Sequence, residues 1–225
     1  MILSKWNIKA IQRLIVNSAT WRQASGSRIP ECDIDPENVL LWRFSPRRLE
    51  AEAIRDSVLA VSGRLNTEQF GLPIFPPLPE DVAETVKWDE SKWSTQNGVE
   101  GRKRSIYIYQ QRSFNMPFLQ SFDATVCDAS LDERRHSITP LQALAMYNGP
   151  FVSQEARQFA DLVGQHVGTS LDTQIDFAFR RALGRAPAQG EVQHMRQLMA
   201  NSAPGEELPG LCRVLFNSSE FVYLQ

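Results

Sequence analysis

Apolar residues recur three or four positions apart through most of this 225-residue chain, and no other sequence feature restricts its fold as strongly. At 3.6 residues per turn, such residues form one stripe along a helix and leave the polar residues on the opposite side. The spacing predicts helices over residues 6–23, 45–63, 139–148, 151–167, 171–183, 187–199 and 208–215. We therefore expect a mainly α-helical, compact single domain of about six to eight helices over residues 1–225.

The middle of the chain breaks this pattern. The segment FGLPIFPPLPED contains four prolines, which cannot lie inside a continuous helix, so residues 66–103 are predicted to be an irregular, loop-rich insertion. In the next segment, RSIYIYQQR, isoleucines alternate with Tyr107 and Tyr109, which indicates a strand over residues 104–112. A strand needs a partner, and short segments of the preceding loop are the best candidates. We expect a small hairpin or a short sheet.

The overall charge argues against two classes of partner. The formal net charge is −2 and 22% of the residues are charged, whereas nucleic-acid and membrane-surface binding usually need a basic excess. No window approaches the ~20 apolar residues of a membrane span. We expect no nucleic-acid partner and no membrane insertion. The start, MILSKWNIKAIQ, has no signal-peptide hydrophobic block, so we expect the chain to be a domain of a longer protein.

Cysteine and histidine residues form no metal-site pattern. Cys32, Cys127 and Cys212 are far apart and make no CxxC or CxxCH motif, so we expect no zinc, no haem and no other cofactor. Three isolated histidines are interpreted as ordinary surface or packing residues: His136, His166 and His194. Phosphate-binding glycine loops, a GxSxG elbow and an HExxH motif are also missing from the sequence.

The stretch SPRRLEAEAIRD, residues 45–56, is dense in charge. Its Ser-Pro start predicts the beginning of a helix. Four charged side chains of that helix fall on one stripe between two apolar surfaces: Arg48, Glu52, Arg55 and Asp56. Charges there are partly removed from water and must pair, so we predict that at least two of them form ion pairs with another part of the chain, for example with Arg134, Arg135 or Asp123. Loss of Glu52 would then cost roughly 3–5 kcal/mol of folding free energy.

Several segments together resemble a known family. They are IQRLIVNSATWRQAS, DPENVLLWRFSPRRLEAEAIRDSVLAVSGRL, GRKRSIYIYQQR, FDATVCDASLDERRHSITPLQALAMYNGPFV, AFRRALGRAPAQGEV and LFNSSEFVYL. They run along almost the whole chain, and they resemble the C-terminal PSD-type domain of unknown function found in large exported planctomycete proteins that often carry a cytochrome c-like domain upstream. The resemblance implies an exported or periplasmic, multidomain parent with a redox-related neighbour. It implies no established activity.

Three classes of function remain open from the sequence. The first is a non-catalytic interaction or structural module that supports neighbouring domains, which the missing nucleophile and metal motifs and the family resemblance favour. The second is a hydrolase-like enzyme acting on a polymer such as a polysaccharide, because paired carboxylates can act as acid and base when their pKa values differ. Its candidate residues are Glu52, Asp56 and Asp123 as acids and bases, with Arg48, Arg55 and Arg112 as anion-binding groups.

The third class is a carbohydrate-binding module. Aromatic side chains offer flat apolar faces to sugar rings, and the irregular segment and the expected strand carry four of them: Trp88, Trp93, Tyr107 and Tyr109. Exposure of these rings in a loop would support this reading, whereas rings packed into the fold would argue against it.

Overall fold

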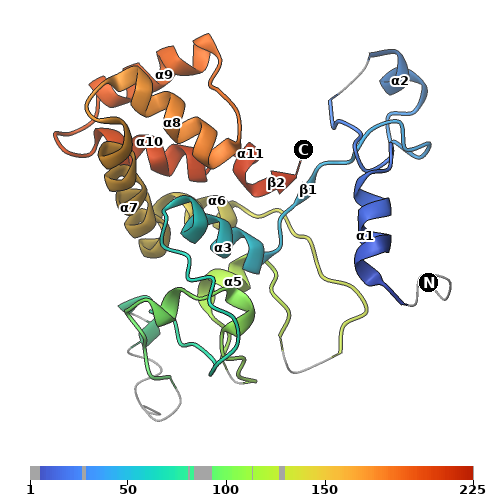
Figure 1. The fold of residues 1–225 in the computed structure, drawn as a ribbon, viewed down its shortest axis with the longest axis horizontal. Coiled ribbons are helices and arrows are strands. Elements are labelled where there is room, and N and C mark those ends of the chain that lie inside the picture. Colours follow the sequence, from blue (N-terminus) through green and yellow to red (C-terminus); the bar gives the residue numbers. More distant parts are fainter. Residues whose placement is uncertain are drawn as a thin grey trace. The chain divides into compact units, whose positions relative to one another are not determined.

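The fold is described from a computed structural model, which covers residues 6–26, 29–80, 82–83, 93–112, 114–126 and 130–224. The expected mainly α-helical fold with a small sheet is confirmed (Figure 1). These residues contain ten α-helices, of which α2, α5 and α11 are only four to six residues long. Such short turns hold too few residues for an apolar stripe, which is why the periodicity predicts only the longer helices.

The helices follow one another along most of the chain. They are α1 (Ile8–Val16), α2 (Ile29–Ile34), α3 (Ala51–Val61), α5 (Pro117–Ser121), α6 (Pro140–Asn148), α7 (Pro150–Val167), α8 (Leu171–Leu183), α9 (Gln189–Ala200), α10 (Glu207–Phe216) and α11 (Ser219–Val222), with the 3-10 helices η3 (Glu100–Arg102) and η4 (Ser105–Tyr107).

The chain forms two compact units, which are described separately. The N-terminal unit consists of residues 1–48 and 223–225, and the main unit consists of residues 49–222. Compact units within one chain are not in themselves separate domains, so the single domain expected from the sequence stays a prediction.

The small sheet belongs to the N-terminal unit and lies where the sequence did not predict it. Strand β1 (Arg47–Arg48) pairs antiparallel with β2 (Tyr223–Leu224), with Arg47 opposite Leu224. Because residues 47–48 are extended, the helix expected from Ser45 begins only at Ala51. Its end agrees with the sequence: Gly63 has a φ of +77°, and a Cβ there would lie 2.5 Å from Leu162 Cδ1, so glycine is favoured.

Residues 104–112 do not form the strand expected from their alternation. Their first part is the 3-10 helix η4, and Ile108 makes a single parallel bridge with Ile74. The Ile74 amide donates to the Tyr107 carbonyl at 2.8 Å, and the Tyr109 amide donates to the Ile74 carbonyl at 3.0 Å. Prolines precede and follow the segment around Ile74 and remove the amide donors that a longer ladder would need. The partner segment was predicted, but its prolines limit the pairing to one residue.

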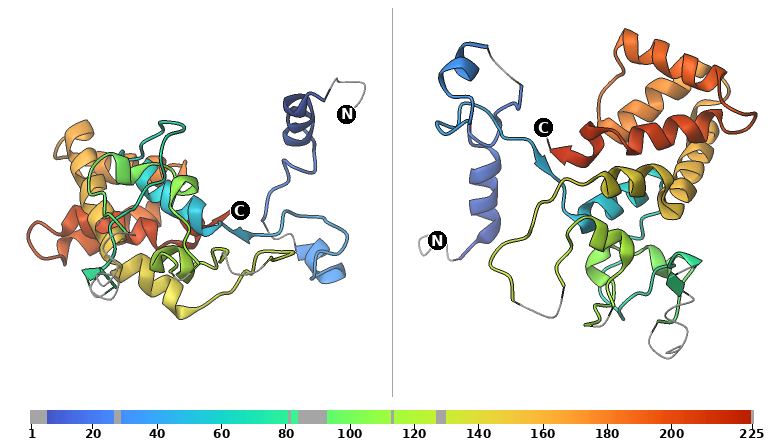
Figure 2. Two further views of the ribbon diagram at one scale, coloured as in Figure 1. Left: turned by 90° about the horizontal axis from the view of Figure 1, so that it is seen from below. Right: turned by 180° about the vertical axis from the view of Figure 1, so that it is seen from behind.

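The core of the main unit lies where α10 packs against α7, with α6, α8 and α9 around them (Figure 2). The Phe159 and Phe216 rings, from α7 and α10, lie 5.7 Å apart, and both side chains are fully buried. Helix α3 adds Ile54, Val58 and Leu59. Each such side chain contributes roughly 1.5–3 kcal/mol through burial. This core holds the charged residues of the candidate site in place.

Candidate functional site

Glu52 on α3 is held by one arginine from a distant part of the chain. The Arg134 guanidinium donates from Nη1 to Glu52 Oε2 at 2.6 Å and from Nη2 to Oε1 at 3.1 Å. Arg134 Nη1 also lies 3.4 Å from the carboxylate of Glu50. Partial burial raises the pKa of Glu52, but the hydrogen bonds from Arg134 outweigh it and the net pKa is lowered. Glu52 is therefore an ionised, paired carboxylate.

Asp56, one turn further along α3, holds the start of η4. Its Oδ1 accepts hydrogen bonds from the Ser105 amide and hydroxyl, both at 2.7 Å, and its Oδ2 lies 3.5 Å from Arg104 Nε. The predicted ion pairs with other parts of the chain are thus confirmed for Glu52 and Asp56. Both carboxylates fix loops onto α3.

Arg55 is the most deeply buried charge on the helix, with 1% of its surface exposed. Its Nη1 donates to the Lys103 carbonyl and to Ser105 Oγ, both at 3.1 Å, and its Nη2 donates to the Gly101 carbonyl at 2.8 Å. Burial lowers the pKa of Arg55 to about 10, and the nearby carboxylates of Asp56 and Glu155 oppose that shift. Arg55 therefore stays protonated at neutral pH, and main-chain oxygens rather than an external anion meet its charge.

Asp123 belongs to a hydrogen-bonded cluster with Ser137 and Gln142. Its backbone is in the left-handed region, with φ of +60°. Its carboxylate accepts from the Ser137 amide and hydroxyl at 2.8 Å, and Gln142 Nε2 donates to the Ser137 carbonyl at 3.1 Å. This cluster connects the residues before α6 to the first turn of that helix, so Asp123 has a positioning role here.

Two of the predicted anion-binding arginines lie outside α3. Arg48 does not belong to the stripe of α3, because it lies in β1 opposite Tyr223 and is buried. Arg112 is exposed in a turn after the Ile108 bridge. The prediction for Arg48 was wrong because it placed the start of the helix too early. Helical spacing shows which side chains share a face only within the helix, and Arg48 precedes its first residue, Ala51.

Of the aromatic candidates, Trp93 is used for packing, whereas Tyr109 is 41% exposed. Trp93 is buried, donates from Nε1 to the Pro76 carbonyl at 3.1 Å, and meets the Phe75 and Phe114 rings edge-on. The Tyr107 hydroxyl accepts from the Phe70 amide at 2.8 Å, and the Tyr109 ring lies 5.2 Å from that of Phe75. Trp88 lies outside the described residues. Trp93 therefore cannot serve as the exposed platform that a sugar ring requires.

One carboxylate of the main unit that was not singled out from the sequence is almost fully buried. Glu155 on α7 accepts from Ser62 Oγ at 2.7 Å, and its Oε1 lies 3.2 Å from Arg64 Nη1. Burial raises the pKa of Glu155, and the Ser62 hydrogen bond and the Arg64 charge partly offset that shift. Both partners follow the end of α3, far from Glu155 in the sequence. The helical spacing around Glu155 therefore cannot predict them.

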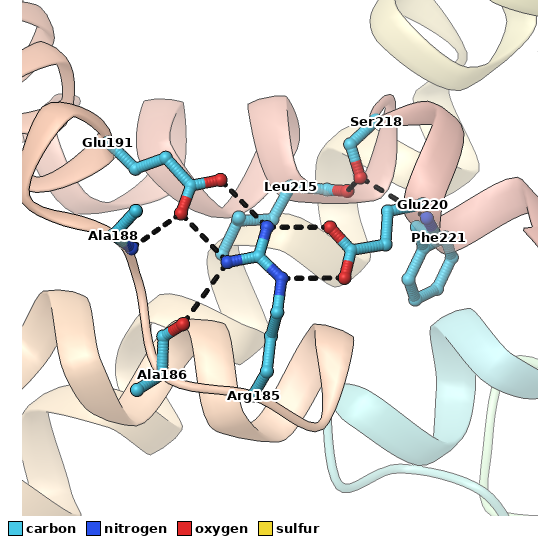
Figure 3. Close-up of polar contacts among 8 residues, drawn as sticks. All are labelled: Arg185, Ala186, Ala188, Glu191, Leu215, Ser218, Glu220 and Phe221. Carbon is cyan, nitrogen blue, oxygen red and sulfur yellow. Dashed lines mark hydrogen bonds and ion pairs between the residues drawn. The ribbon is translucent and has the colours of Figure 1, made fainter. Parts of the chain in front are cut away.

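An arginine-centred joint connects three helices near the C-terminal end of the main unit (Figure 3). Arg185 donates from Nε and Nη2 to the two oxygens of Glu220 at 2.7 Å, and from Nη1 and Nη2 to the oxygens of Glu191 at 2.8 and 2.7 Å. Nη1 also donates to the Ala186 carbonyl at 3.1 Å. The joint connects the end of α8 with the start of α9 and with α11. All five N–H groups of the Arg185 guanidinium donate within the joint, so none is left to bind a ligand.

The outer face of α6 carries a row of large apolar side chains. Leu141 and Leu144 are 67% and 53% exposed, and Tyr147 continues the row one further step along the helix. The opposite face of the same helix buries Gln142 and Met146. The sequence shows the apolar residues of α6 but not which of them face inward, since apolar residues occur on both sides.

Metal-binding groups and free thiols were sought among the residues that the structure describes. Among them, no three or more His, Cys, Asp and Glu side chains are grouped so that they could hold a metal ion. Cys32 and Cys212 are free thiols, and burial raises the pKa of Cys212; Cys127 lies outside the described residues. His166 packs its ring on Phe177 at 5.4 Å. No helix in the described ranges is long and apolar enough to cross a membrane.

A comparison with protein families gives one match, which extends over residues 1–199. The matching family is PSD1, described as a protein of unknown function (DUF1553). The chain belongs to the PSD1 family. No curated protein and no solved structure matches the chain significantly. The resemblance to a PSD-type domain expected from the sequence is thereby confirmed.

The PSD1 match covers most of the elements described above, but not α10, α11 and β2. It includes α3 with Glu52, the loop that carries Arg134, and the whole of α6. It ends one residue before the end of α9, so Glu220 of the arginine-centred joint lies beyond it. The PSD1 description assigns no reaction and no ligand.

Proposed function

We propose that this PSD1 chain is a non-catalytic interaction module that packs against neighbouring domains of a longer, exported, cytochrome c-associated protein. The observation that carries the proposal is the outer face of α6, where Leu141, Leu144 and Tyr147 are exposed side by side at three-residue spacing. Residues three apart lie on one side of a helix, so these side chains form one continuous apolar row.

The distribution of buried and exposed side chains on α6 supports an interaction role. The helix turns a polar side chain, Gln142, towards the protein interior and two leucines towards solvent. A contiguous exposed apolar surface is a mark of a protein contact site, because leaving it in water opposes solubility and brings no stability. Ile138, just before the helix, is 81% exposed and lengthens the apolar surface.

The arrangement of the acidic candidates supports a role without catalysis. Glu52 is bound by Arg134, Asp56 is bound by Ser105, and Asp123 is bound by Ser137. Each of these contacts connects two segments of the main unit, which is the work of structural ion pairs and hydrogen bonds. An acid–base pair for hydrolysis needs two carboxylates that face a common substrate.

The proposal is tested by measuring the binding of this chain to the neighbouring domains of its parent protein, produced separately. We expect the unchanged chain to bind, and the double variant Leu141→Ser/Leu144→Ser to bind at least about tenfold more weakly, since buried apolar anchors dominate such contacts. Both leucines are exposed, so the thermal midpoint of the variant should stay close to that of the unchanged chain.

A matched control uses two exposed apolar residues of the main unit outside α6. The variant Leu72→Ser/Val99→Ser removes comparable surface from positions that are 84% and 61% exposed, and it should bind like the unchanged chain. The proposal is wrong if the α6 variant binds as tightly as this control, or if no neighbouring domain binds the unchanged chain.

A further inference from the structure

Helix α1 of the N-terminal unit has an apolar face that nothing in that unit covers. Ile8, Leu14 and Ile15 lie on one side of the helix, none of its residues is buried, and Leu14 is 75% exposed. The helix is nonetheless well formed, since the Asn7 side chain accepts from the Ala10 amide at 3.1 Å and caps its start. A helix with one apolar face is ordinarily covered on that face.

The other face of α1 is basic. Lys9 and Arg13 lie on it, and Arg22 lies in the turn segment that follows the helix. All three are exposed. Residues 1–30 contain five Lys and Arg residues and no acidic residue. Residues 1–48 hold eight basic and four acidic residues, a net charge of +4, whereas the remaining 177 residues hold 16 and 22, a net charge of −6. The chemistry around α1 therefore favours an anionic partner.

A loop of the N-terminal unit exposes further apolar side chains in a fixed conformation. The Asp35 carboxylate accepts from the amides of Val39 at 3.0 Å and Leu40 at 2.7 Å. Leu41 has a φ of +54°, which costs energy for a residue with a side chain. These bonds hold three consecutive aliphatic side chains outward, and Leu40 is 75% exposed. Hydrogen bonds that fix an apolar loop tip in water indicate a contact made by that tip.

We propose that the N-terminal unit binds peripherally to an anionic lipid surface, with α1 lying along the headgroup region. The proposal goes beyond the α6 contact, because it concerns another surface and another class of partner. At nine residues, α1 is about 14 Å long, too short to cross a bilayer but long enough to lie in its interface. Its apolar face would enter the headgroup boundary, while Lys9 and Arg13 meet lipid phosphates.

Two observations favour lipid over an acidic protein groove. Trp6 and Trp21, one on each side of α1 in the sequence, are both exposed, and tryptophan is the side chain enriched at the membrane–water boundary. The apolar groups also lie on two separate segments, α1 and the 39–41 loop, rather than on one helix face. A groove must match the shape of both segments, whereas a fluid lipid surface accepts them without matching.

Co-sedimentation with vesicles tests the inference. One set of vesicles is pure phosphatidylcholine, and the other contains equal parts of phosphatidylcholine and phosphatidylglycerol. We expect the chain to bind the anionic vesicles only, and binding to weaken as salt rises from about 0.1 M to about 0.5 M. Leu14→Glu should reduce the affinity roughly tenfold or more, because it places a charge in the apolar boundary, and Lys9→Gln/Arg13→Gln should weaken binding to the anionic vesicles.

The matched control is Leu72→Glu, the same change at an exposed leucine of the main unit, which should bind vesicles like the unchanged chain. Unchanged circular dichroism of each variant shows that folding is intact. Equal binding to both kinds of vesicle, or equal binding of the Leu14 variant, overturns the inference. So does a chain that ignores both vesicles but uses Leu14 to bind a neighbouring domain, and in that case the α6 proposal still stands on its own test.

Discussion

Arg55 carries a full positive charge inside the main unit, and most of its hydrogen bonds go to main-chain carbonyls. Carbonyl dipoles and the neighbouring Asp56 carboxylate, 3.8 Å away, replace the water that the guanidinium loses on folding. The three contacts connect α3 to residues 101–105, about fifty positions later in the chain. One buried side chain thus determines where the irregular middle segment ends.

The sequence predicted correctly that charges of this stretch would pair with distant residues, but it did not show which of them is the most deeply buried. Glu52 was expected to be the buried charge, yet its side chain is 26% exposed, and Arg55 is the enclosed one. Periodicity shows which residues share a stripe. It does not show which end of the stripe the rest of the chain covers, because that depends on residues 101–105 and 134.

The first prediction concerns this difference. Arg55→Ala should lower the free energy of unfolding by roughly 3–5 kcal/mol, because it leaves the buried carbonyls of Gly101 and Lys103 without their donor. Glu52→Ala should cost only about 0–1 kcal/mol, since its ion pair with Arg134 is partly open to solvent. Urea unfolding of the two variants measures both values.

Arg104→Ala is the control for loss of an arginine, because Arg104 is 60% exposed beside the same Asp56. It should change stability little. A larger loss for Glu52→Ala than for Arg55→Ala would contradict this account of the stripe.

At the scale of elements, helix bounds followed from local chemistry more reliably than extended structure did. Helix α8 has the predicted bounds because Gly184, in the left-handed region, ends it directly after its last apolar residue. Residues 104–112 were predicted wrongly because alternation describes side-chain direction, whereas a strand also needs a partner with free amides. Strands of two residues, such as β1 and β2, show no alternation that a sequence could reveal.

The arginine-centred joint (Figure 3) leads to a prediction on acid stability. Hydrogen bonds from Arg185 hold the pKa of Glu191 at about 2, well below its ordinary value of 4.5. A carboxylate whose pKa is lowered by folding stabilises the fold above its ordinary pKa, and it loses that contribution as the pH falls through its folded value. We therefore expect the joint to weaken between about pH 4.5 and pH 2.

Comparison with Glu191→Gln isolates this residue from the other carboxylates that titrate in acid. The variant should be less stable than the unchanged chain at pH 7, and the difference should shrink as the pH falls from 4.5 towards 2. Thermal midpoints measured across that range provide the check. A difference that stays constant down to pH 2 would mean that Glu191 does not stabilise the fold through its charge.

For the whole molecule, the net charge of −2 is the sum of +4 in residues 1–48 and −6 in the remaining residues. The expectation of no membrane-surface contact rested on that total, in which a basic N-terminal unit and an acidic main unit nearly cancel. Counting charge within each unit requires their boundary, near residue 48, and no motif in the sequence marks it. The exposure of α6 was unpredictable for a related reason, since it depends on which helices pack around α10.

The distribution of buried residues predicts how backbone protection varies along the chain. Amides of α7 and α10 should exchange slowest with deuterium, because these helices pack the centre of the main unit. Amides of α1 should exchange fast, since a nine-residue helix without buried side chains is marginal in water. Hydrogen–deuterium exchange read by mass spectrometry measures both. Protection of α1 equal to that of α7 would show that its apolar face is already covered.

The pairing of β1 with β2 also bears on how the protein is made. The two strands are adjacent in space, yet the entire main unit, 174 residues from Leu49 to Val222, lies between them in the sequence. A ribosome adds roughly 5–20 residues per second, so Arg47 and Arg48 are synthesised about 9–35 s before their partners. During that interval the N-terminal segment has an unpaired strand and an uncovered apolar helix, which are the features that chaperones bind. The residues that complete the N-terminal unit are thus synthesised only after the whole main unit.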